Sequence, residues 1–243
     1  MAQIELKNLH KSFGEQTVLD GIELTVESGE TVSVLGRSGT GKSVLLKLLI
    51  GLQKPDSGSI SIDGHEITGL DTRELNEVRK NIGFLFQEGA LYDSMTIEQN
   101  VEFPLKRHTT QSPEERKKRV RELLASVGLE SDFAKLPGEI SGGMKKRVGL
   151  ARALALDPKL IMFDEPTSGL DPISSAEIGE LILDLKKKRK ITSVVVTHDM
   201  HSAKHISDRL VVLDGGRIVA EGTYDDLEKS NHPVVKGFLR EQG

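Results

Sequence analysis

The pattern of hydrophobic residues predicts several strands that are buried on both faces. Each is a short run with few polar side chains, and helical or turn-like segments separate the runs. The runs are Thr31–Leu35, Ile82–Gln87, Leu160–Phe163 and Ser193–Thr197. Central strands of a parallel sheet have this composition because helices cover both of their faces. The pattern therefore predicts a sheet of this kind at the centre of the protein.

Other segments alternate between apolar and polar residues with a period of two, which is typical of strands with one solvated face. The alternation runs over Ile4–Leu9 and Gly21–Val26 and predicts antiparallel strands near the N-terminus. Residues 59–64 predict a further strand that ends in an Asp-Gly turn. Residues 210–219 are typical of a hairpin that closes the sheet.

The middle of the chain changes to a helical pattern interrupted by loops. Ser112, Pro113 and Glu115 have the spacing of a capped helix start, with serine as the cap and proline in the first turn. This change of pattern predicts a helical subdomain inserted at residues 88–157. The strand and helix alternation resumes at 158–222, and a short tail, 223–243, has no evident role.

Composition excludes several classes of site. The chain has 243 residues, a net charge of −4 and no cysteine, so disulfides and cysteine-based metal or catalytic sites are excluded. No apolar run approaches the roughly 18 residues of a membrane-spanning helix, and we expect no secretory signal in residues 1–5. The net charge is too mild to argue for or against nucleic acid, but the absence of tryptophan weakens a model of single-strand binding by aromatic stacking, and we expect no nucleic-acid partner. The basic run 116–119 is interpreted as solvated helix surface, and the basic run 186–190 as a structural feature of a helix C-terminus, where positive charge compensates the helix dipole.

One segment carries a clear chemical signal, because it fits the phosphate-binding loop pattern G-x-x-x-x-G-K-[ST] between a predicted strand and a predicted helix. Its glycines let the backbone wrap around an anion, and the amides at the helix start point at phosphate groups. Lys42 is expected to reach the β and γ phosphates, and the Ser43 hydroxyl to bind Mg²⁺. The predicted loop consists of Gly36, Arg37, Ser38, Gly39, Thr40, Gly41, Lys42 and Ser43. The sequence therefore predicts that the protein binds a nucleoside triphosphate.

Two adjacent acids follow another apolar strand. Asp164 ends the run Leu160–Phe163, which places its carboxylate at the carboxyl edge of the sheet, where ligands of such sheets bind. We expect Asp164 to hold Mg²⁺ through water. Glu165 comes one residue later, out of the register of the strand, and can polarise a water molecule for attack on the γ phosphate.

A second anion-binding helix start is predicted at Ser141, Gly142 and Gly143, which precede a helical segment. A serine cap and free backbone amides are suited to phosphate groups. The chain then has two phosphate-directed helix starts and only one lysine-bearing loop. A simple way to use both is for two copies to share each nucleotide.

These motifs, in this order, resemble the ATPase subunits of ATP-binding cassette (ABC) transporters over essentially the full chain. The resemblance implies an α/β fold with a P-loop nucleotide core (1–87 and 158–222), an antiparallel β part and the helical insertion. It implies ATP and Mg²⁺ as ligands, with Phe13 stacked on adenine and Asp171 at the seam of a homodimer. It assigns catalytic roles to Glu165, His198, Gln87 and Lys42, and metal contacts to Ser43, Gln87 and Asp164. In the dimer, Ser141, Gly142 and Gly143 of one copy would contact the ATP that the other copy holds.

The chain departs from the usual family signature at one point, where Met144 replaces a glutamine. Together with residues 86–96 and 100–105, this substitution resembles the Mla/Mce-associated lipid transporters of bacterial envelopes. The resemblance implies a peripheral protein on the cytoplasmic face of the inner membrane. Its implied partners are transmembrane permease subunits, a Mce-type lipid-binding protein and a small regulatory subunit, and its implied cargo is a phospholipid or related lipid.

Three alternatives stay open. The same ATPase can serve a transporter of another substrate, such as an amino acid, a metal or a drug. A soluble ABC-type ATPase that acts on DNA or ribosomes is a second alternative, although the chain has one cassette and no heptad-rich insertion. A module that binds ATP without hydrolysing it is the third, and the presence of both Glu165 and His198 argues against it.

Overall fold

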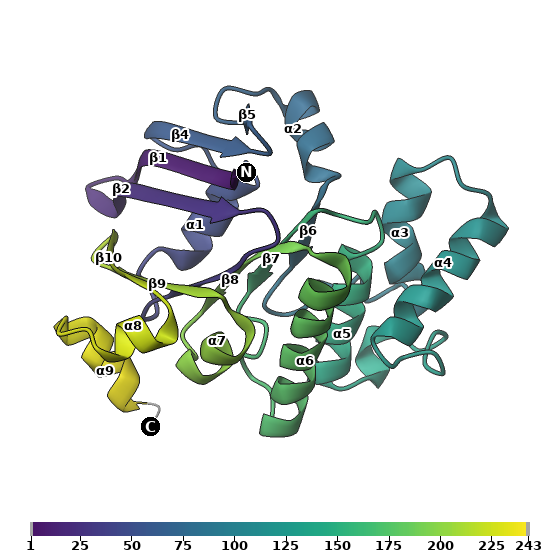
Figure 1. Ribbon diagram of the computed structural model, residues 1–243. Coiled ribbons are helices and arrows are strands. Elements are labelled where there is room, and N and C mark those ends of the chain that lie inside the picture. The colour runs from purple at the N-terminus through teal and green to yellow at the C-terminus, as the bar shows by residue number, and fades with distance from the viewer. Residues whose placement is uncertain (1, 242–243) are drawn as a thin grey trace.

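The computed structural model describes residues 2–241 and contains two sheets with helices packed against them (Figure 1). Met1, in the segment where we expect no secretory signal, lies outside the described residues, as do 242–243 at the end of the predicted tail. The strands are Ala2–Phe13 (β1), Gln16–Glu27 (β2), Thr31–Leu35 (β3), Ser57–Ile62 (β4), His65–Glu66 (β5), Ile82–Leu85 (β6), Leu160–Asp164 (β7), Thr192–Thr197 (β8), Arg209–Asp214 (β9) and Arg217–Gly222 (β10). The α-helices are Lys42–Leu49 (α1), Thr72–Arg79 (α2), Ile97–His108 (α3), Pro113–Ser126 (α4), Gly142–Ala153 (α5), Pro172–Arg189 (α6), Met200–Ile206 (α7), Tyr224–Glu228 (α8) and Pro233–Glu241 (α9), with a 3₁₀ turn at Pro137–Glu139.

The larger sheet has the strand order β10-β9-β3-β8-β7-β6. Its strands β9, β3, β8, β7 and β6 run parallel, and only β10 is antiparallel to its neighbour. Every residue of β3 and β8 is buried, as the apolar runs predict. Both faces are covered, because α1 packs on one side and α5 and α6 on the other, which is the arrangement that purely apolar strands require.

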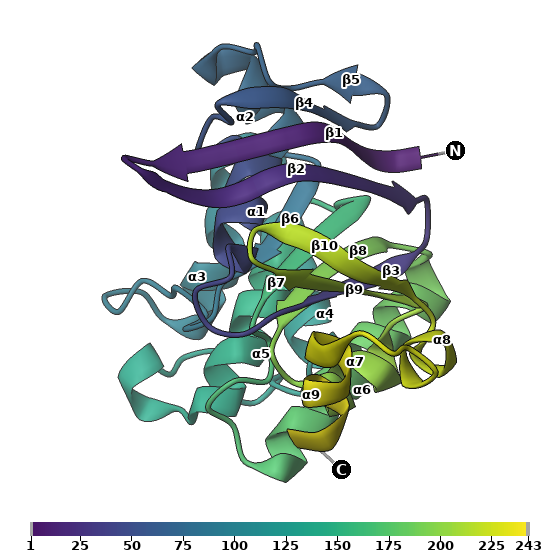
Figure 2. The same ribbon diagram turned by 90° about the vertical axis from the view of Figure 1, so that its left-hand side faces the viewer.

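The smaller sheet is antiparallel, with the order β2-β1-β4-β5, and lies above the larger one in Figure 2. Helix α1 is held between the two sheets, because its leucines share one core with residues from both. β1 and β2 are each about twice as long as the alternating segments in the sequence. The difference has a physical cause: register shifts after Leu6 and Leu9 interrupt the alternation, and Asn8 adopts a positive φ of 45°.

Helices α3, α4 and α5 pack against one another as a helical layer on the side of the molecule away from the antiparallel sheet, and they share one core with α6 and the larger sheet (Figure 1). Ser112 caps α4 through a reciprocal pair with Glu115, as its sequence predicts. Asn100 of α3 is fully buried and accepts from the Tyr92 amide at 2.8 Å, which fixes the loop that leads into this layer. The domain boundaries at residues 88 and 157 stay a prediction.

Residues from the end of the chain pack against the larger sheet. Leu227 of α8 and Phe238 of α9 belong to a small core that also contains Leu35 of β3. The part of the predicted tail that the structure describes is therefore folded onto the strand that precedes the phosphate loop. Within residues 2–241, no helix has the length and apolar composition needed to cross a bilayer.

Candidate functional site

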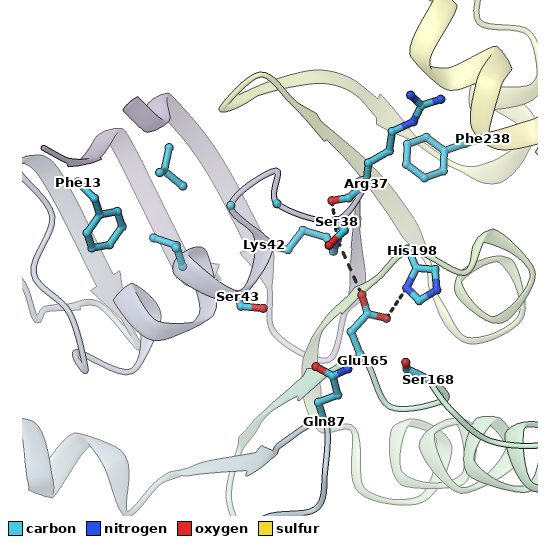
Figure 3. A pocket seen from close by; sticks show the side chains of 14 residues that line it. Phe13, Arg37, Ser38, Lys42, Ser43, Gln87, Glu165, Ser168, His198 and Phe238 are labelled. Carbon is cyan, nitrogen blue, oxygen red and sulfur yellow. Dashed lines mark hydrogen bonds and ion pairs between the residues drawn. The ribbon is translucent and has the colours of Figure 1, made fainter. Parts of the chain in front are cut away.

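The predicted site residues meet because neighbouring parallel strands end at the same edge of the sheet. β3 leads into the phosphate loop, β8 into His198, and β7 into Glu165. β6 pairs with β7 and leads toward Gln87. Residues from distant parts of the sequence, from Phe13 to Phe238, therefore line one cavity of about 800 Å³ (Figure 3). The lining residues are Phe13, Val18, Arg37, Ser38, Gly39, Gly41, Lys42, Ser43, Val44, Gln87, Glu165, Ser168, His198 and Phe238.

The phosphate loop wraps around the Lys42 side chain. The Lys42 ammonium donates to the carbonyl of Gly36 at 2.6 Å and to that of Arg37 at 3.1 Å. Thr40 closes the loop from the other side by donating its hydroxyl to the Arg37 carbonyl at 2.9 Å. Burial lowers the pKa of Lys42, and the nearby carboxylates of Glu165 and Asp164 oppose this shift. The loop therefore holds a cation inside the cavity.

Two of the loop glycines leave no room for a side chain. A Cβ on Gly36 would lie 2.8 Å from the carbonyl oxygen of Leu213, which is closer than real Cβ atoms approach. Gly41 has a φ of +100°, and a Cβ there would lie 2.9 Å from a methyl group of Leu19. Both the positive φ and the close approach exclude larger residues. The loop residues thus fit a bound triphosphate, since they form a narrow cradle of backbone amides.

Glu165 contacts both Lys42 and His198 within the cavity. Its carboxylate lies 3.8 Å from the Lys42 ammonium and 2.9 Å from Nδ1 of His198 (Figure 3). A carboxylate can only accept, so this contact favours the His198 tautomer with its proton on Nδ1. Glu165 is 12% exposed and His198 is 57% exposed. The glutamate is therefore shielded, while the histidine faces solvent beside it.

The backbone of Glu165 is strained. Its φ is 48°, in the left-handed region that residues with a side chain rarely adopt. The amide of Glu165 donates to the carbonyl of Val196 at 2.9 Å, which ties this turn to β8. Strain of this kind costs about 1–3 kcal/mol and persists where the surroundings hold it in place. The turn aims the side chain into the cavity rather than along the strand.

Ser43 and Asp164 fit a magnesium ion. The Ser43 hydroxyl donates to the Asp164 carboxylate at 3.3 Å, and both present the oxygen atoms that Mg²⁺ prefers. Burial raises the pKa of Asp164, and the charge of Glu165 raises it further. A divalent cation beside these oxygens would favour the ionised carboxylate. Among the described residues, no group of three His, Cys, Asp or Glu side chains could hold a metal without a nucleotide.

Phe13 and Gln87 both line the cavity, as expected. Phe13 ends β1 with a ring that is 47% exposed, and the Lys11 ammonium lies 5.3 Å from the ring centre. A large exposed aromatic face is suited to stacking against a base. The segment that follows Gln87 is fixed by Arg152 of α5, which donates to the carbonyls of Gly89 and Ala90 at 2.8 and 2.9 Å.

The structure does not bring Ser141, Gly142 and Gly143 to this cavity, since none of the described residues that line it comes from that segment. Ser141 caps α5 as predicted, and its side chain accepts from the Met144 amide at 3.2 Å. Ser141 and Gly142 are exposed. The second predicted anion site thus faces solvent on a different part of the molecule.

Some lining residues have no recognisable signal in the sequence. Val18 and Phe238 belong to β2 and α9, and only the fold brings them to the phosphate loop. In Figure 3, Phe13 and Phe238 lie on opposite sides of that loop, and Phe238 is close to Arg37. Ser168 follows Glu165 by three residues, and only the structure shows that it also lines the cavity.

Comparison with known proteins identifies relatives over nearly the whole chain. The ABC transporter family model matches residues 19–168. The chain is 47% identical over 236 residues to a probable ribonucleotide transport ATP-binding protein of Mycobacterium tuberculosis, a match that covers 97% of the chain and 66% of the relative. It is 45% identical to a methionine import ATP-binding protein of Rhizobium johnstonii, over 97% of the chain and 65% of the relative. The chain thus spans slightly less than two thirds of the length of these relatives.

The chain is also similar to solved structures of ATP-binding cassettes. A dimeric ATP-binding cassette in a post-hydrolysis state, bound to ADP and phosphate, has a TM-score of 0.84 and 38% identity, over 90% of the chain and 98% of that structure. A Clostridium perfringens protein that is part of an ABC transporter complex has a TM-score of 0.86 and 30% identity, over 98% of the chain and 95% of that structure. These matches confirm the predicted α/β P-loop fold.

The cradle geometry predicts the effect of a single methyl group. Gly41→Ala should weaken ATP binding about tenfold or more, because the loop must shift to relieve both a φ of +100° and the contact with Leu19. Gly64→Ala is the matched control, since Gly64 has a φ of +78° with no atom within 4 Å of the added Cβ. Titration with a fluorescent ATP analogue measures the affinities. Equal affinities for the two variants would contradict the cradle.

Proposed function

The chain belongs to the ABC transporter family, and we propose that it is the ATP-hydrolysing subunit of a membrane transporter. ATPase activity and ATP as the nucleotide, both predicted from the sequence, follow from this membership. One observation supports the catalytic part of the proposal above all others. Glu165 contacts both Lys42 and His198 inside the cavity that the phosphate loop borders.

Hydrolysis of ATP is an in-line displacement at the γ phosphorus. A water oxygen bonds to phosphorus, the bond to the bridging oxygen breaks, and ADP leaves. Glu165 accepts the proton of the attacking water as a general base. His198 holds the carboxylate in place and contacts the γ phosphate, and Gln87 orients the water.

Positive charge stabilises the transition state, because negative charge spreads over the equatorial phosphate oxygens. Lys42 moves from its own loop carbonyls to the phosphates when ATP binds, which exchanges neutral acceptors for charged ones. Ser43, Asp164 and Gln87 would hold Mg²⁺, which would supply further positive charge to the bound phosphates. Phe13 stacks on the adenine.

The position of the second anion site supports a shared nucleotide. Ser141 and Gly142 are exposed and do not line the cavity of their own copy, yet the first amides of α5 have no partner within the helix. In a homodimer, this helix start closes over the ATP that the opposite phosphate loop holds. The site is incomplete until the second copy arrives, which makes dimerisation dependent on ATP.

The neighbouring start of α6 has the properties of a dimer seam. Asp171 caps α6 by accepting from the amides of Ile173 and Ser174, both at 3.0 Å, and these bonds lower the pKa of Asp171. Ile173 is an exposed hydrophobic residue, with 74% of its surface accessible. A Cβ on Gly143 would lie 3.0 Å from the Ser174 hydroxyl, so the two helix starts are adjacent. They therefore present one continuous surface to a second copy.

The transmembrane partner is expected to bind the helical layer. A groove of about 410 Å³ is lined by Phe86, Tyr92, Phe103 and Arg152, among others. Phe86 and Tyr92 are 39% and 46% exposed, which is unusual for large aromatic side chains. The groove adjoins the segment after Gln87, so a permease helix bound there would be coupled to the catalytic cavity. We therefore propose that the protein acts at the cytoplasmic face of the inner membrane.

For the cargo, we favour a phospholipid or related lipid. The resemblance of residues 86–96 and 100–105, with Met144, to Mla/Mce-associated transporters supports this choice. A Mce-type lipid-binding protein and a small regulatory subunit would then complete the complex. The names of the relatives favour a second candidate, import of methionine or a ribonucleotide.

Loss of the proposed base should separate binding from turnover. Glu165→Gln should lower kcat about 10²- to 10⁴-fold and preserve ATP affinity, because the amide keeps its shape but cannot take the proton. ATP-bound dimers should accumulate, which size-exclusion chromatography detects. Glu180→Gln is the matched control, since it removes an exposed carboxylate that contacts a histidine, His205, at 2.8 Å. Normal phosphate release by the Glu165 variant would remove this residue from its role.

A mixed dimer tests the shared site. One subunit carries both Ser141→Arg and Lys42→Ala and the other carries neither, with both subunits in an E165Q background that retains ATP. If each site forms between the two copies, each site has one defect and no ATP is retained. If each copy binds ATP alone, the copy without the two substitutions still retains about one ATP per dimer. Filter binding with labelled ATP distinguishes these outcomes.

Reconstitution tests the cargo. The membrane proteins that copurify with the chain from a detergent extract are placed in vesicles that contain a fluorescent phospholipid. We expect ATP-dependent movement of the lipid, with none for the Glu165→Gln complex. Stimulation of ATP hydrolysis by methionine or a ribonucleotide, without lipid movement, would favour the second candidate and contradict the first.

A further inference from the structure

A buried lysine on the signature helix α5 has no part in the mechanism above. Lys146 lies one turn after Ser141 and is only 4% exposed. Its ammonium donates to the main-chain carbonyl of Glu165 at 3.0 Å and to that of Ser168 at 2.6 Å. Among the described residues, none forms a carboxylate ion pair with Lys146, whereas its neighbour in sequence, Arg147, lies 3.9 Å from the carboxylate of Glu177.

The burial of this charge is costly. Removing an ammonium from water is unfavourable unless polar groups replace the solvent. Burial lowers the pKa of Lys146, and the charges of Glu88 and Glu165 oppose this shift. Two carbonyl oxygens at hydrogen-bond distance replace water here. A hydrophobic residue would fill the same space at a lower cost, so the contact needs a reason other than packing.

The two carbonyls belong to the turn that carries the proposed base. The amide of Ser168 donates to the Glu165 carbonyl at 3.3 Å, so Lys146 bonds both ends of one short turn. Glu165 has a φ of 48° in this turn, and Ser168 lines the ATP cavity. The ammonium therefore lies where it can hold a strained backbone in a single conformation.

We propose that Lys146 is a positioning residue that fixes the Glu165–Ser168 turn and thereby the direction of the Glu165 carboxylate. The proposal rests on the proposed function, because it assigns Lys146 a role through Glu165. Helix α5 then serves two sites. Its start contacts the nucleotide of the partner, and Lys146, one turn later, orders the base of its own copy.

Kinetics of three variants test this proposal. Lys146→Met should lower kcat for ATP hydrolysis about tenfold to a hundredfold, because displacement of a catalytic group by about 1 Å costs this much. The KM for ATP should change less than about threefold, since the phosphate loop is untouched. Lys146→Arg should recover most of kcat, because it restores a cationic donor. Lys145→Met removes the same charge from a neighbouring, less buried position and should resemble the wild type.

Amide hydrogen exchange of the 165–168 turn gives a readout that does not depend on hydrolysis. Exchange at Ser168 should be faster in Lys146→Met than in Lys145→Met, because the Glu165 carbonyl that accepts this amide is no longer anchored. Lys146→Gln is a second variant for the case that Lys146→Met does not fold, because its amide retains hydrogen-bond donors without the charge.

The outcomes are distinct. Wild-type kcat and exchange in Lys146→Met would overturn the proposal. If Lys146→Met lowers kcat, ATP affinity and melting temperature together, Lys146 has only a structural role, and the proposal is also overturned. If the wild-type protein does not hydrolyse ATP, the proposed function fails, whereas the exchange result still decides whether Lys146 holds the turn.

Discussion

The site depends on the order of four neighbouring parallel strands. Across the sheet, β3 pairs with β8, β8 with β7, and β7 with β6, and neighbouring strands are about 4.8 Å apart. Their carboxyl ends therefore place a lysine, a histidine, a glutamate and a glutamine within one cavity, although these residues come from distant parts of the chain. Because both faces of the sheet are covered, this edge is where polar groups of the strands can meet a ligand.

Strain at Glu165 shows how the fold maintains an unfavourable conformation. A left-handed glutamate would relax if the backbone around it were free. The Val196 carbonyl binds its amide, and Lys146 binds its carbonyl, so both polar groups of the residue are engaged by other elements. The side chain is in turn restrained between Lys42 and His198. A reactive group that is held from four directions loses little freedom when ATP arrives, which lowers the entropic cost of catalysis.

The sequence predicts the local motifs of the site better than it predicts strand lengths or tertiary contacts. Local motifs identify the phosphate loop, Asp164, Glu165 and the capping serine of α5, because each is encoded within a few residues. The lengths of β1 and β2 could not be predicted, since shifts of register after Leu6 and Leu9 hide the alternation. Phe238 and Lys146 were also missed. Their contacts are tertiary: neither the short helix that contains Phe238 nor the basic helical run that contains Lys146 has a local feature that reveals what these residues touch.

Helix α5 contacts several segments of the site that are far apart in the sequence. α5 begins with exposed amides that face away from its own cavity, holds the turn of Glu165 through Lys146, and grips the segment after Gln87 through Arg152. These contacts lie along a single twelve-residue helix. A displacement of α5 would therefore move both loops of its own cavity together. The same helix lines the aromatic groove through Arg152 and Ala153, so α5 links that groove to the turn of the base without involving the phosphate loop.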